Sequence, residues 1–389
     1  VHDRVKHTIR FDQVNFLTSV DASFGAALVN KFCGHTKTIR KLRKSTTQDN
    51  HKTVLLSISD FPKHNYIWEP LSLEKGVTLA KRFRIDLSDA THEESSDFGP
   101  HILDAVIVND FIPATSNRRH HRVATIESGG YISYWDCNGS TRDDQAAEII
   151  NRLPIKDHND IFMRSTPRAF VLTKSSPTKT KTDLYNETDP GNESHFIAIA
   201  IYEDECKAWE LQESGLKDCK VDKLPENFHL IAEIDLYANE LNVLSAIDLN
   251  GILRIFSVEN DGDCLHWKQS SSLHTNVKKA AGLHGATFVH KMAIVDDSGM
   301  KLSIWDTNLG LLEYEEEFEE PVLDLDWTKI HDEYSQFANL SVGFKHHVYL
   351  YTQLRYDYTN KVNAYGKFKM LDILDYTFHE IGDLIWTND

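Results

Sequence analysis

The sequence predicts an all-β fold built as a β-propeller, because one β-hairpin design recurs along the chain at a regular spacing. Two copies close on Trp-Asp after a glycine-containing turn, in the segments His121 to Asp136 and Met292 to Asp306. A third copy, Leu244 to Val258, carries Asn250-Gly251, a pair that predicts a type I′ turn between two strands. Repetition of one hairpin design predicts a repeat fold.

The spacing of the hairpins favours a propeller of the WD-repeat-like type. Six hairpins end on an aromatic residue, at Trp68, Trp135, Trp209, Phe256, Trp305 and Tyr351. The last three gaps, of 47, 49 and 46 residues, are close to the roughly 40–45 residues of one WD-type blade. An all-β sandwich is the alternative fold, and it explains the strands but not the period.

The two longer gaps contain polar segments that we interpret as loop insertions. One lies near residues 91–100 and is acidic, and the other lies near 173–195 and is rich in Ser, Thr, Pro and charge. Such segments bury too little apolar surface to offset the entropy of ordering them. We therefore expect one propeller domain over residues 1–389 with two solvated insertions, of which the second is disordered.

The order of strands and both ends of the chain predict a closed ring. After Trp305-Asp306 the sequence predicts an outer strand, a charged connection, and then an inner strand that opens at Pro321-Val322. Further strand-like segments lie within Val1 to Lys44 and from Ile381 to Trp386. Joining the two ends in one blade gives seven blades and removes exposed sheet edges.

Composition predicts a soluble protein and excludes a nucleic-acid partner. No stretch approaches the run of about 18 apolar residues that a membrane span requires, and the N-terminal segment lacks the apolar core of a signal peptide. The formal charge is −17, from 42 basic and 59 acidic residues, whereas nucleic-acid binding needs a basic face. The odd number of scattered cysteines favours free thiols in a reducing cytosol (Cys33, Cys137, Cys206, Cys219 and Cys264).

Two charged clusters are candidate docking surfaces. The first, Lys37 to Lys44, is suited to an acidic partner or to anionic lipid headgroups, and its alternative interpretation is a solvated loop. The second, Glu313 to Glu320, places six carboxylates in eight residues on a predicted outer strand, where the charges also discourage edge-to-edge aggregation. The candidate partner-binding residues are Lys37, Arg40, Lys41, Arg43, Lys44, Glu313, Glu315, Glu316, Glu317, Glu319 and Glu320.

The sequence contains none of the common hydrolase, nucleotide-binding or paired-cysteine zinc motifs. We interpret the pairs His120-His121 and His346-His347 as turn residues, because neighbours on a strand point to opposite faces. The segment Glu259 to Cys264 resembles the start of a calcium loop but lacks the downstream glutamate, so a turn explains it. We predict no catalytic, cofactor-binding or metal-ligating residue. The alternative is a propeller enzyme with histidines and carboxylates at its central channel.

The C-terminal stretch carries two runs that point to a family. The first extends from Val342 to Thr359 and reads VG..HHV.LY.QLR.DYT, and the second extends from Ile381 to Trp386 and reads IGD.IW. His379 precedes the second run by two residues. Together these runs resemble the rabconnectin and DmX-like family, at the end of its second propeller, as found in the large scaffold subunit of the RAVE complex.

This resemblance implies a cytosolic, non-catalytic scaffold that is cut from a longer protein and is peripheral at vacuolar or endosomal membranes. It implies a role in rejoining the peripheral sector of the vacuolar proton-pumping ATPase (V-ATPase) to the membrane sector. The implied partners are peripheral-sector subunits, a second RAVE subunit, and a small adaptor shared with ubiquitin ligases. The matched positions are mainly strands and turns, so none is assigned to a partner. The alternative is a WD-type adaptor of a vesicle coat or a ubiquitin ligase.

Overall fold

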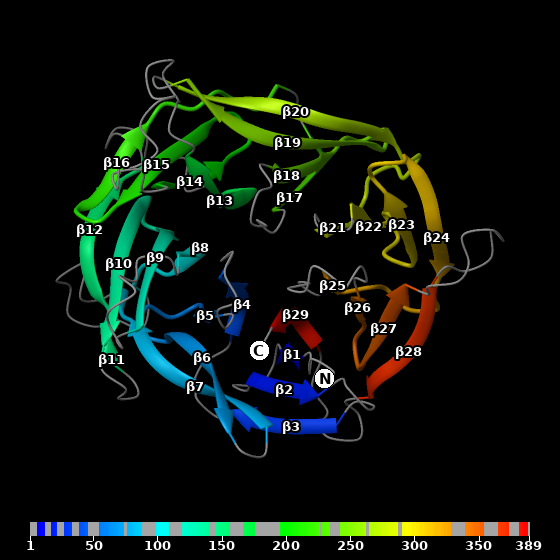
Figure 1. Cartoon of the computed structure of the whole chain (residues 1–389), viewed down its shortest axis with the longest axis horizontal. Helices are drawn as coiled ribbons and strands as arrows, with labels where there is room; N and C mark the ends of the chain where they lie inside the picture. Colours follow the sequence, from blue (N-terminus) through cyan, green and yellow to red (C-terminus); the bar gives the residue numbers. More distant parts are fainter. Residues whose placement is uncertain are drawn as a thin grey trace, which may run out of the picture.

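In the computed structural model, the described strands form seven sheets that stand around a central axis like the blades of a propeller (Figure 1). Each blade has four antiparallel strands, and one blade gains a short fifth strand at its outer edge. The prediction of a seven-bladed, all-β propeller is therefore confirmed. The structure describes residues 6–11, 17–21, 27–32, 39–45, 54–73, 76–87, 99–108, 119–139, 145–155, 166–175, 195–225, 228–233, 242–261, 264–286, 290–327, 339–353, 365–372 and 381–387.

Blades 1 to 6 follow one another along the chain, and within each blade the first strand lines the central channel. Blade 1 consists of β4 (Ile39–Lys44), β5 (Leu55–Ser59), β6 (Asn65–Leu73) and β7 (Gly76–Ile85). Blade 2 consists of β8 (Ile102–Val108), β9 (Arg119–Glu127), β10 (Tyr131–Gly139) and β12 (Glu148–Pro154). Blade 3 consists of β13 (Ala169–Ser175), β14 (His195–Ile201), β15 (Cys206–Gln212) and β16 (Gly215–Cys219). Blade 4 consists of β17 (Leu230–Glu233), β18 (Asn242–Ile247), β19 (Ile252–Asn260) and β20 (Leu265–His274). Blade 5 consists of β21 (Gly282–Ala286), β22 (Lys291–Val295), β23 (Lys301–Asp306) and β24 (Leu311–Glu317). Blade 6 consists of β25 (Asp324–Trp327), β26 (Asn339–Gly343), β27 (His347–Gln353) and β28 (Tyr365–Asp372). The fifth strand of blade 1 is β11 (Gln145–Ala146), which runs parallel to β7.

Blade 7 combines strands from both ends of the chain. Its strands, from the channel outward, are β29 (Ile381–Thr387), β1 (Lys6–Phe11), β2 (Leu17–Asp21) and β3 (Ala27–Phe32). β29 pairs antiparallel with β1, with Ile385 opposite Thr8, and Figure 1 shows both termini at this blade. The inner strand β29 also lies beside β25 and β4, the inner strands of the neighbouring blades. The predicted closure by both ends is confirmed.

The six hairpins predicted from the sequence form the second and third strands of blades 1 to 6. The predicted type I′ turn at Asn250-Gly251 is wrong, because Gly251 has a φ of 84° but Asn250 is not among the described residues with positive φ. The Asp248 carboxylate accepts a hydrogen bond from the Asn250 amide at 2.8 Å, and the Asp248 carbonyl accepts one from the Gly251 amide at 3.1 Å. This pattern fits a type I turn followed by a left-handed glycine, which the aspartate side chain stabilises.

The tryptophans that end the hairpins are buried anchors of the blades. Trp68 donates its indole N–H to the Ser57 hydroxyl at 2.7 Å, and Trp135 donates to the Thr125 hydroxyl at 2.9 Å, in each case across to the preceding strand. A buried indole N–H needs such a partner. Trp68 and Trp135 are therefore each held by packing and by one hydrogen bond to a Ser or Thr of the preceding strand.

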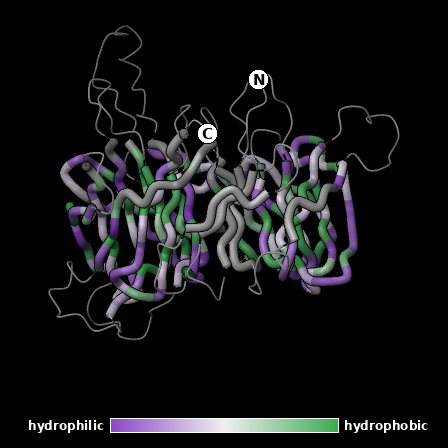
Figure 2. Tube along the Cα trace, turned by 90° about the horizontal axis from the view of Figure 1, so that it is seen from below, coloured by the Kyte–Doolittle hydropathy of each residue, from purple (hydrophilic) through white to green (hydrophobic). Residues whose placement is uncertain are grey.

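The hydrophobic core lies between neighbouring blades. One cluster joins blades 2, 3 and 4, another joins blades 5 and 6, and smaller ones join blades 1 and 2 and blades 4 and 5. Figure 2 shows hydrophobic residues concentrated inside the ring wall and hydrophilic ones at its turns and outer edge. Within the described ranges, no helix has the length and apolar character needed to cross a membrane.

Most of the two predicted insertions falls outside the described residues, which omit 88–98 and 176–194. The insertions, and the assignment of residues 1–389 to a single domain, stay predictions.

Candidate functional site

The basic cluster forms the inner strand of blade 1, which corrects its interpretation as a solvated loop. Strand β4 covers Ile39–Lys44, and Ile39 and Leu42 are buried while the cations between them are half-buried. Lys37 lies outside the described residues. The segment forms a strand because Ile39 and Leu42 pack with buried residues of β5 and β6 in the same blade, while its cations bind carboxylates on other blades.

Asp104 on β8 is the main partner of these cations. Arg43 donates to both carboxylate oxygens of Asp104 at 2.6 Å, and Lys41 donates to one of them at 2.9 Å. Burial by itself raises the pKa of Asp104, but the charges and hydrogen bonds of Arg43 and Lys41 outweigh it and lower the pKa to about 2. Asp104 is thus an anion that holds blades 1 and 2 together.

The remaining cations of the cluster reach other inner strands. Lys44 donates to Asp326 of β25 at 2.9 Å, and His284 of β21 lies 3.2 Å from the same carboxylate. Arg40 donates to the carbonyl groups of Ile102 and Leu103. These four cations form an ionic belt around the channel, defined here as Arg40, Lys41, Arg43 and Lys44 with Asp104 and Asp326. Contact with an outside partner would compete with these internal bonds.

The acidic cluster occupies β24, the outer strand of blade 5, and the segment after it, as the sequence predicts. Its inner side is bonded within the protein: Glu316 accepts hydrogen bonds from Tyr314 at 2.5 Å, Tyr351 at 2.8 Å and Lys367 at 2.6 Å. Burial raises the pKa of Glu316, but these three donors outweigh it and hold the pKa below its usual value. Glu316 therefore joins blades 5 and 6.

Other members of the cluster are also engaged inside the protein. Glu313 accepts hydrogen bonds from Lys291 and from Tyr365, the latter at 2.9 Å, and Glu320 lies 3.1 Å from His347. The six carboxylates thus divide into two groups. Glu313, Glu316 and Glu320 are half-buried and join structural elements, whereas Glu315, Glu317 and Glu319 are exposed at every second position, with Glu315 paired to Lys301 of the same blade at 2.8 Å.

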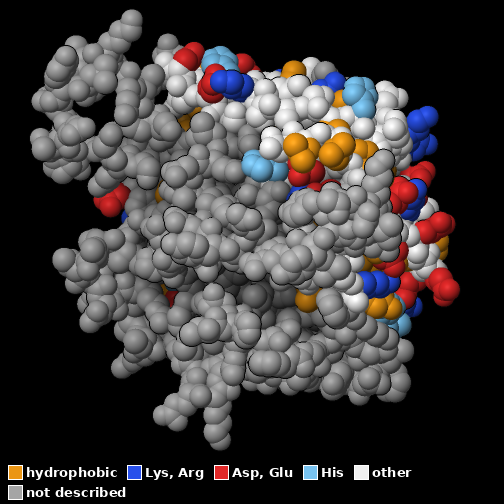
Figure 3. All heavy atoms as spheres, turned by 45° about the vertical axis from the view of Figure 1, so that its right-hand side comes forward, with side chains coloured by type: hydrophobic (Ala, Val, Ile, Leu, Met, Phe, Trp, Pro, Cys, Tyr) orange, Lys and Arg blue, Asp and Glu red, His pale blue; other side chains and the backbone are white. Residues whose placement is uncertain are grey.

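Three exposed leucines accompany the outward carboxylates. Leu309, Leu311 and Leu312 expose 67%, 57% and 44% of their surface, at the turn into β24 and at its start. We call these leucines together with Glu315, Glu317 and Glu319 the β24 surface. Figure 3 brings this side of the ring forward and shows mainly acidic side chains along its right-hand edge, with basic and a few hydrophobic ones among them. Sequence reasoning missed the leucines, although the run Leu309-Gly310-Leu311-Leu312 departs from the alternation of a strand with one exposed face.

The channel side of blades 4 to 6 contains a cavity of about 210 Å³. Its described lining is mainly apolar, and His284 and Asp324 are the titratable residues in it. None of these lining residues is Ser, Thr, Cys or Lys. The described lining therefore offers no hydroxyl, thiol or amine nucleophile, and its reactive side chains are the His284 imidazole and the Asp324 carboxylate.

The histidine pairs are only partly turn residues, which corrects their interpretation. His121 is buried on β9, and its Nε2 lies 2.6 Å from the Glu69 carboxylate. His346 lies in the turn before β27, while His347 begins that strand and stacks on Phe344 at a centroid distance of 4.9 Å. Burial against a carboxylate or an aromatic ring, which a local pattern does not reveal, determines these positions.

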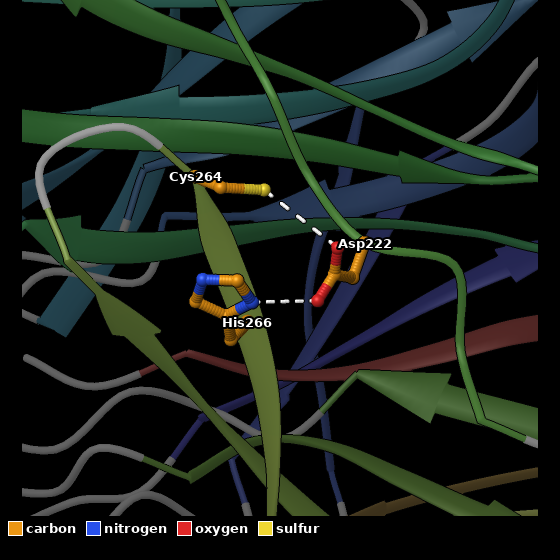
Figure 4. Close-up of side chains that lie close together, drawn as sticks. All are labelled: Asp222, Cys264 and His266. Carbon is orange, nitrogen blue, oxygen red and sulfur yellow. Dashed lines mark hydrogen bonds and ion pairs between the residues drawn. The ribbon is translucent and has the colours of Figure 1, made fainter.

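A separate cluster joins Asp222, Cys264 and His266 at the outer side of blade 4 (Figure 4). His266 Nδ1 lies 2.6 Å from one Asp222 oxygen, and the Cys264 sulfur lies 3.7 Å from the other. Their donor atoms all lie within 4.8 Å of one another, so they can hold a metal ion. The prediction that Glu259 to Cys264 is merely a turn did not anticipate this arrangement, because Asp222 is 42 positions away from Cys264.

The described parts of the two C-terminal runs that suggested a family lie in blades 6 and 7. In the first run, Val342, Val348 and Tyr351 are fully buried in blade 6, and residues 354–359 lie outside the described part of the chain. The second run forms β29, the strand that closes the ring. The four described cysteines are free thiols, as predicted, and Cys33 lies outside the described residues.

Seven four-stranded blades around a channel, with the ring closed by strands from both ends, define a β-propeller of the WD-repeat-like type. Residues 251–389 match the family described as RAVE protein 1 C terminal. This match covers the C-terminal third of the chain and includes both C-terminal runs that resemble the family in the sequence.

Two curated relatives carry the same description, "Regulator of V-ATPase in vacuolar membrane protein 1". The protein of Saccharomyces cerevisiae is 28% identical over 99% of this chain and 26% of its own length. The protein of Schizosaccharomyces pombe is 30% identical over 38% of this chain and 12% of its own length. The chain thus spans about a quarter of the first relative.

Among solved structures, a putative 6-phosphogluconolactonase from Bacteroides uniformis is similar with a TM-score of 0.54. It is 10% identical, and the alignment covers 99% of this chain and 100% of that chain. At this identity the similarity concerns the fold alone.

Proposed function

We propose that the chain is a non-catalytic protein-interaction scaffold, part of a longer RAVE large subunit that promotes reassembly of the peripheral sector of the V-ATPase onto its membrane sector. The observation that carries this proposal is the similarity, at 28% identity, to a protein described as a V-ATPase regulator over 99% of the chain. Because the chain spans only 26% of that relative, the partners of the whole protein are inferred from the relationship. The proposed partners are peripheral-sector subunits and the other RAVE subunits, met in the cytoplasm and at vacuolar or endosomal membranes.

The ionic belt of the channel fits a structural role better than a catalytic one. A propeller enzyme would need a titratable group available for proton transfer at the channel. Asp104 instead has a pKa lowered to about 2 and is bonded to Arg43 and Lys41, so it remains an anionic counterion at neutral pH. The described lining of the channel cavity adds no hydroxyl, thiol or amine group, and its titratable residues are His284 and Asp324. These features fit a rigid body whose outer surfaces carry the function.

The β24 surface is the docking surface that the structure favours. Three outward carboxylates and three exposed leucines lie on one outer strand and its preceding turn, so the matching partner is a basic segment with apolar side chains. The cations of the β4 cluster are less suited to docking, because they already bind carboxylates and carbonyl groups of the inner strands.

The test is affinity capture from cytosol with the 389-residue chain, scored for subunits of the V-ATPase peripheral sector. The variant Glu315→Gln/Glu317→Gln/Glu319→Gln should capture at least about tenfold less, since each lost charge removes favourable interaction with a basic partner. The matched control is Glu148→Gln/Glu203→Gln/Glu213→Gln, which removes three exposed carboxylates from other blades. This control variant should capture the same amount of peripheral-sector subunits as the unmodified chain.

Recovery of vesicle-coat or ubiquitin-ligase components alone would overturn the assignment to V-ATPase assembly. If both triple variants lost pump subunits equally, the loss would reflect the total charge of the chain. The β24 surface would then not be the docking surface.

A further inference from the structure

We propose that Asp222, Cys264 and His266 form a binding site for a divalent transition-metal ion of the zinc type, on the outer side of blade 4. The three donors come from two segments: Asp222 precedes β17, whereas Cys264 and His266 flank Leu265 at the start of β20. Figure 4 shows the three side chains converging on one point between these segments. Such a site goes beyond the scaffold function proposed above.

Backbone hydrogen bonds hold the two segments together independently of any metal ion. Val221 and Leu265 form a parallel bridge, with the Asp222 amide donating to the Leu265 carbonyl and the Leu265 amide donating to the Lys220 carbonyl, each at 2.9 Å. The Trp267 indole N–H donates to the Asp222 carbonyl at 3.0 Å. The donors are therefore placed by the fold, so binding does not have to order a loose loop.

The distances suit tetrahedral coordination after a small adjustment. With zinc–sulfur and zinc–oxygen bonds of about 2.3 and 2.0 Å, a tetrahedral angle places sulfur and oxygen about 3.5 Å apart and nitrogen and oxygen about 3.3 Å apart. The Cys264 sulfur already lies 3.7 Å from an Asp222 oxygen. The 2.6 Å separation of His266 Nδ1 from Asp222 must open by about 0.7 Å, a movement that the half-exposed side chains allow.

Asp261 supplies the outer support that metal-binding histidines usually have. Its carboxylate lies 2.9 Å from His266 Nε2, the nitrogen that points away from Asp222. The other Asp261 oxygen accepts a hydrogen bond from the Cys264 amide at 2.9 Å. A carboxylate on the second imidazole nitrogen fixes the ring and directs Nδ1 toward the metal.

The donor set selects the class of metal. One thiolate, one imidazole and one carboxylate suit zinc or cobalt, whereas calcium and magnesium prefer oxygen ligands alone. The side chains of Asp222 and His266 are 54% and 43% exposed, so the site is open to solvent. Three protein ligands leave a fourth position for water or for a donor from a bound partner.

Cobalt(II) added to the full 389-residue chain is the direct probe, because thiolate coordination produces a near-ultraviolet charge-transfer band and tetrahedral coordination produces visible bands. We expect one equivalent of bound cobalt with both signals, displaced by one equivalent of zinc. Cys264→Ser should abolish the charge-transfer band. Cys219→Ser, which changes another half-buried free thiol, should leave it unchanged.

Binding affinity for zinc, measured by competition with a chromophoric chelator, separates ligands from neighbours. His266→Gln should lower the affinity at least about tenfold, and Asp261→Asn should lower it by about 10- to 100-fold through loss of the supporting carboxylate. His274→Gln, at the other end of β20, is the matched control and should not change it. Far-ultraviolet circular dichroism checks that each variant keeps its β structure.

Three outcomes would overturn the site. The first is the absence of stoichiometric cobalt binding, the second is a charge-transfer band that survives Cys264→Ser, and the third is zinc affinity that falls equally with His266→Gln and His274→Gln. The last two would indicate adventitious binding to other thiols or scattered histidines.

Discussion

Asp104 is a single buried carboxylate that neutralises cations of the neighbouring blade. It is 2% exposed and accepts hydrogen bonds from Arg43 and Lys41 of the neighbouring blade. Removing one partner of a buried ion pair is costly because the other charge stays desolvated. The ionic belt therefore stabilises the fold as a set, and its members are poor candidates for independent substitution.

Asp104→Asn should lower the free energy of unfolding by about 3 kcal/mol, because it leaves Arg43 and Lys41 without their anion. Equilibrium denaturation in urea measures this change. Asp60→Asn is the control, since Asp60 is half-exposed and lies 3.5 Å from Arg40. Its effect should stay below about 1 kcal/mol. Equal effects of the two substitutions would contradict the structural role of Asp104.

The same residue predicts how stability depends on pH. The pKa of Asp104 is about 2 in the folded protein against 3.8 for an unperturbed carboxyl, so the folded state favours the anion. This contribution, roughly 2 kcal/mol, is complete above the unfolded pKa and is lost as the pH falls toward the folded pKa. The stability difference between the unmodified chain and Asp104→Asn should therefore shrink between about pH 4 and pH 2. A difference that stays constant over this range would contradict the ion pair.

At the scale of elements, hairpins are local and were therefore predictable. Alternating strands, a glycine turn and a terminal Trp are all contained in one short segment, and all six predicted hairpins form. Strand β4 was not predictable in the same way, because the anions that accept its cations lie 61 and 282 positions away along the chain. The Asp222, Cys264 and His266 cluster depends in the same way on a contact between distant segments.

Alanine substitutions at two turn glycines distinguish the cost of backbone strain from the cost of a steric contact. Gly251 and Gly130 have φ values of 84° and 80°, so alanine at either position meets a similar conformational cost of about 1 kcal/mol. A Cβ on Gly251 would also lie 2.7 Å from the Val277 carbonyl oxygen, whereas a Cβ on Gly130 meets nothing within 4 Å. Gly251→Ala should therefore lower the melting temperature clearly more than Gly130→Ala. Equal shifts in thermal unfolding would show that the contact with Val277 relaxes freely.

At the scale of the whole molecule, the period of the hairpins and the strand-like segments at both ends predicted a closed seven-bladed ring. The structure confirms that closure through β29 and β1. The proposed docking surface on β24 was less accessible to prediction. The run from Glu313 to Glu320 marks its charge, but only the fold shows which carboxylates join blades 5 and 6 and which face outward beside exposed leucines.

The pairing of the two ends is the feature on which the ring and its surfaces depend, and a disulfide bond tests it most directly. Thr8 and Ile385 are opposite each other in the β1 and β29 pair, which is within the range that a disulfide can bridge. The double variant Thr8→Cys/Ile385→Cys should form this bond under mild oxidation, as measured by non-reducing electrophoresis and peptide mass spectrometry. The control Thr8→Cys/Ile252→Cys pairs blade 7 with blade 4 and should not form one. Failure of the first pair to cross-link, or equal cross-linking of both pairs, would contradict the closed ring.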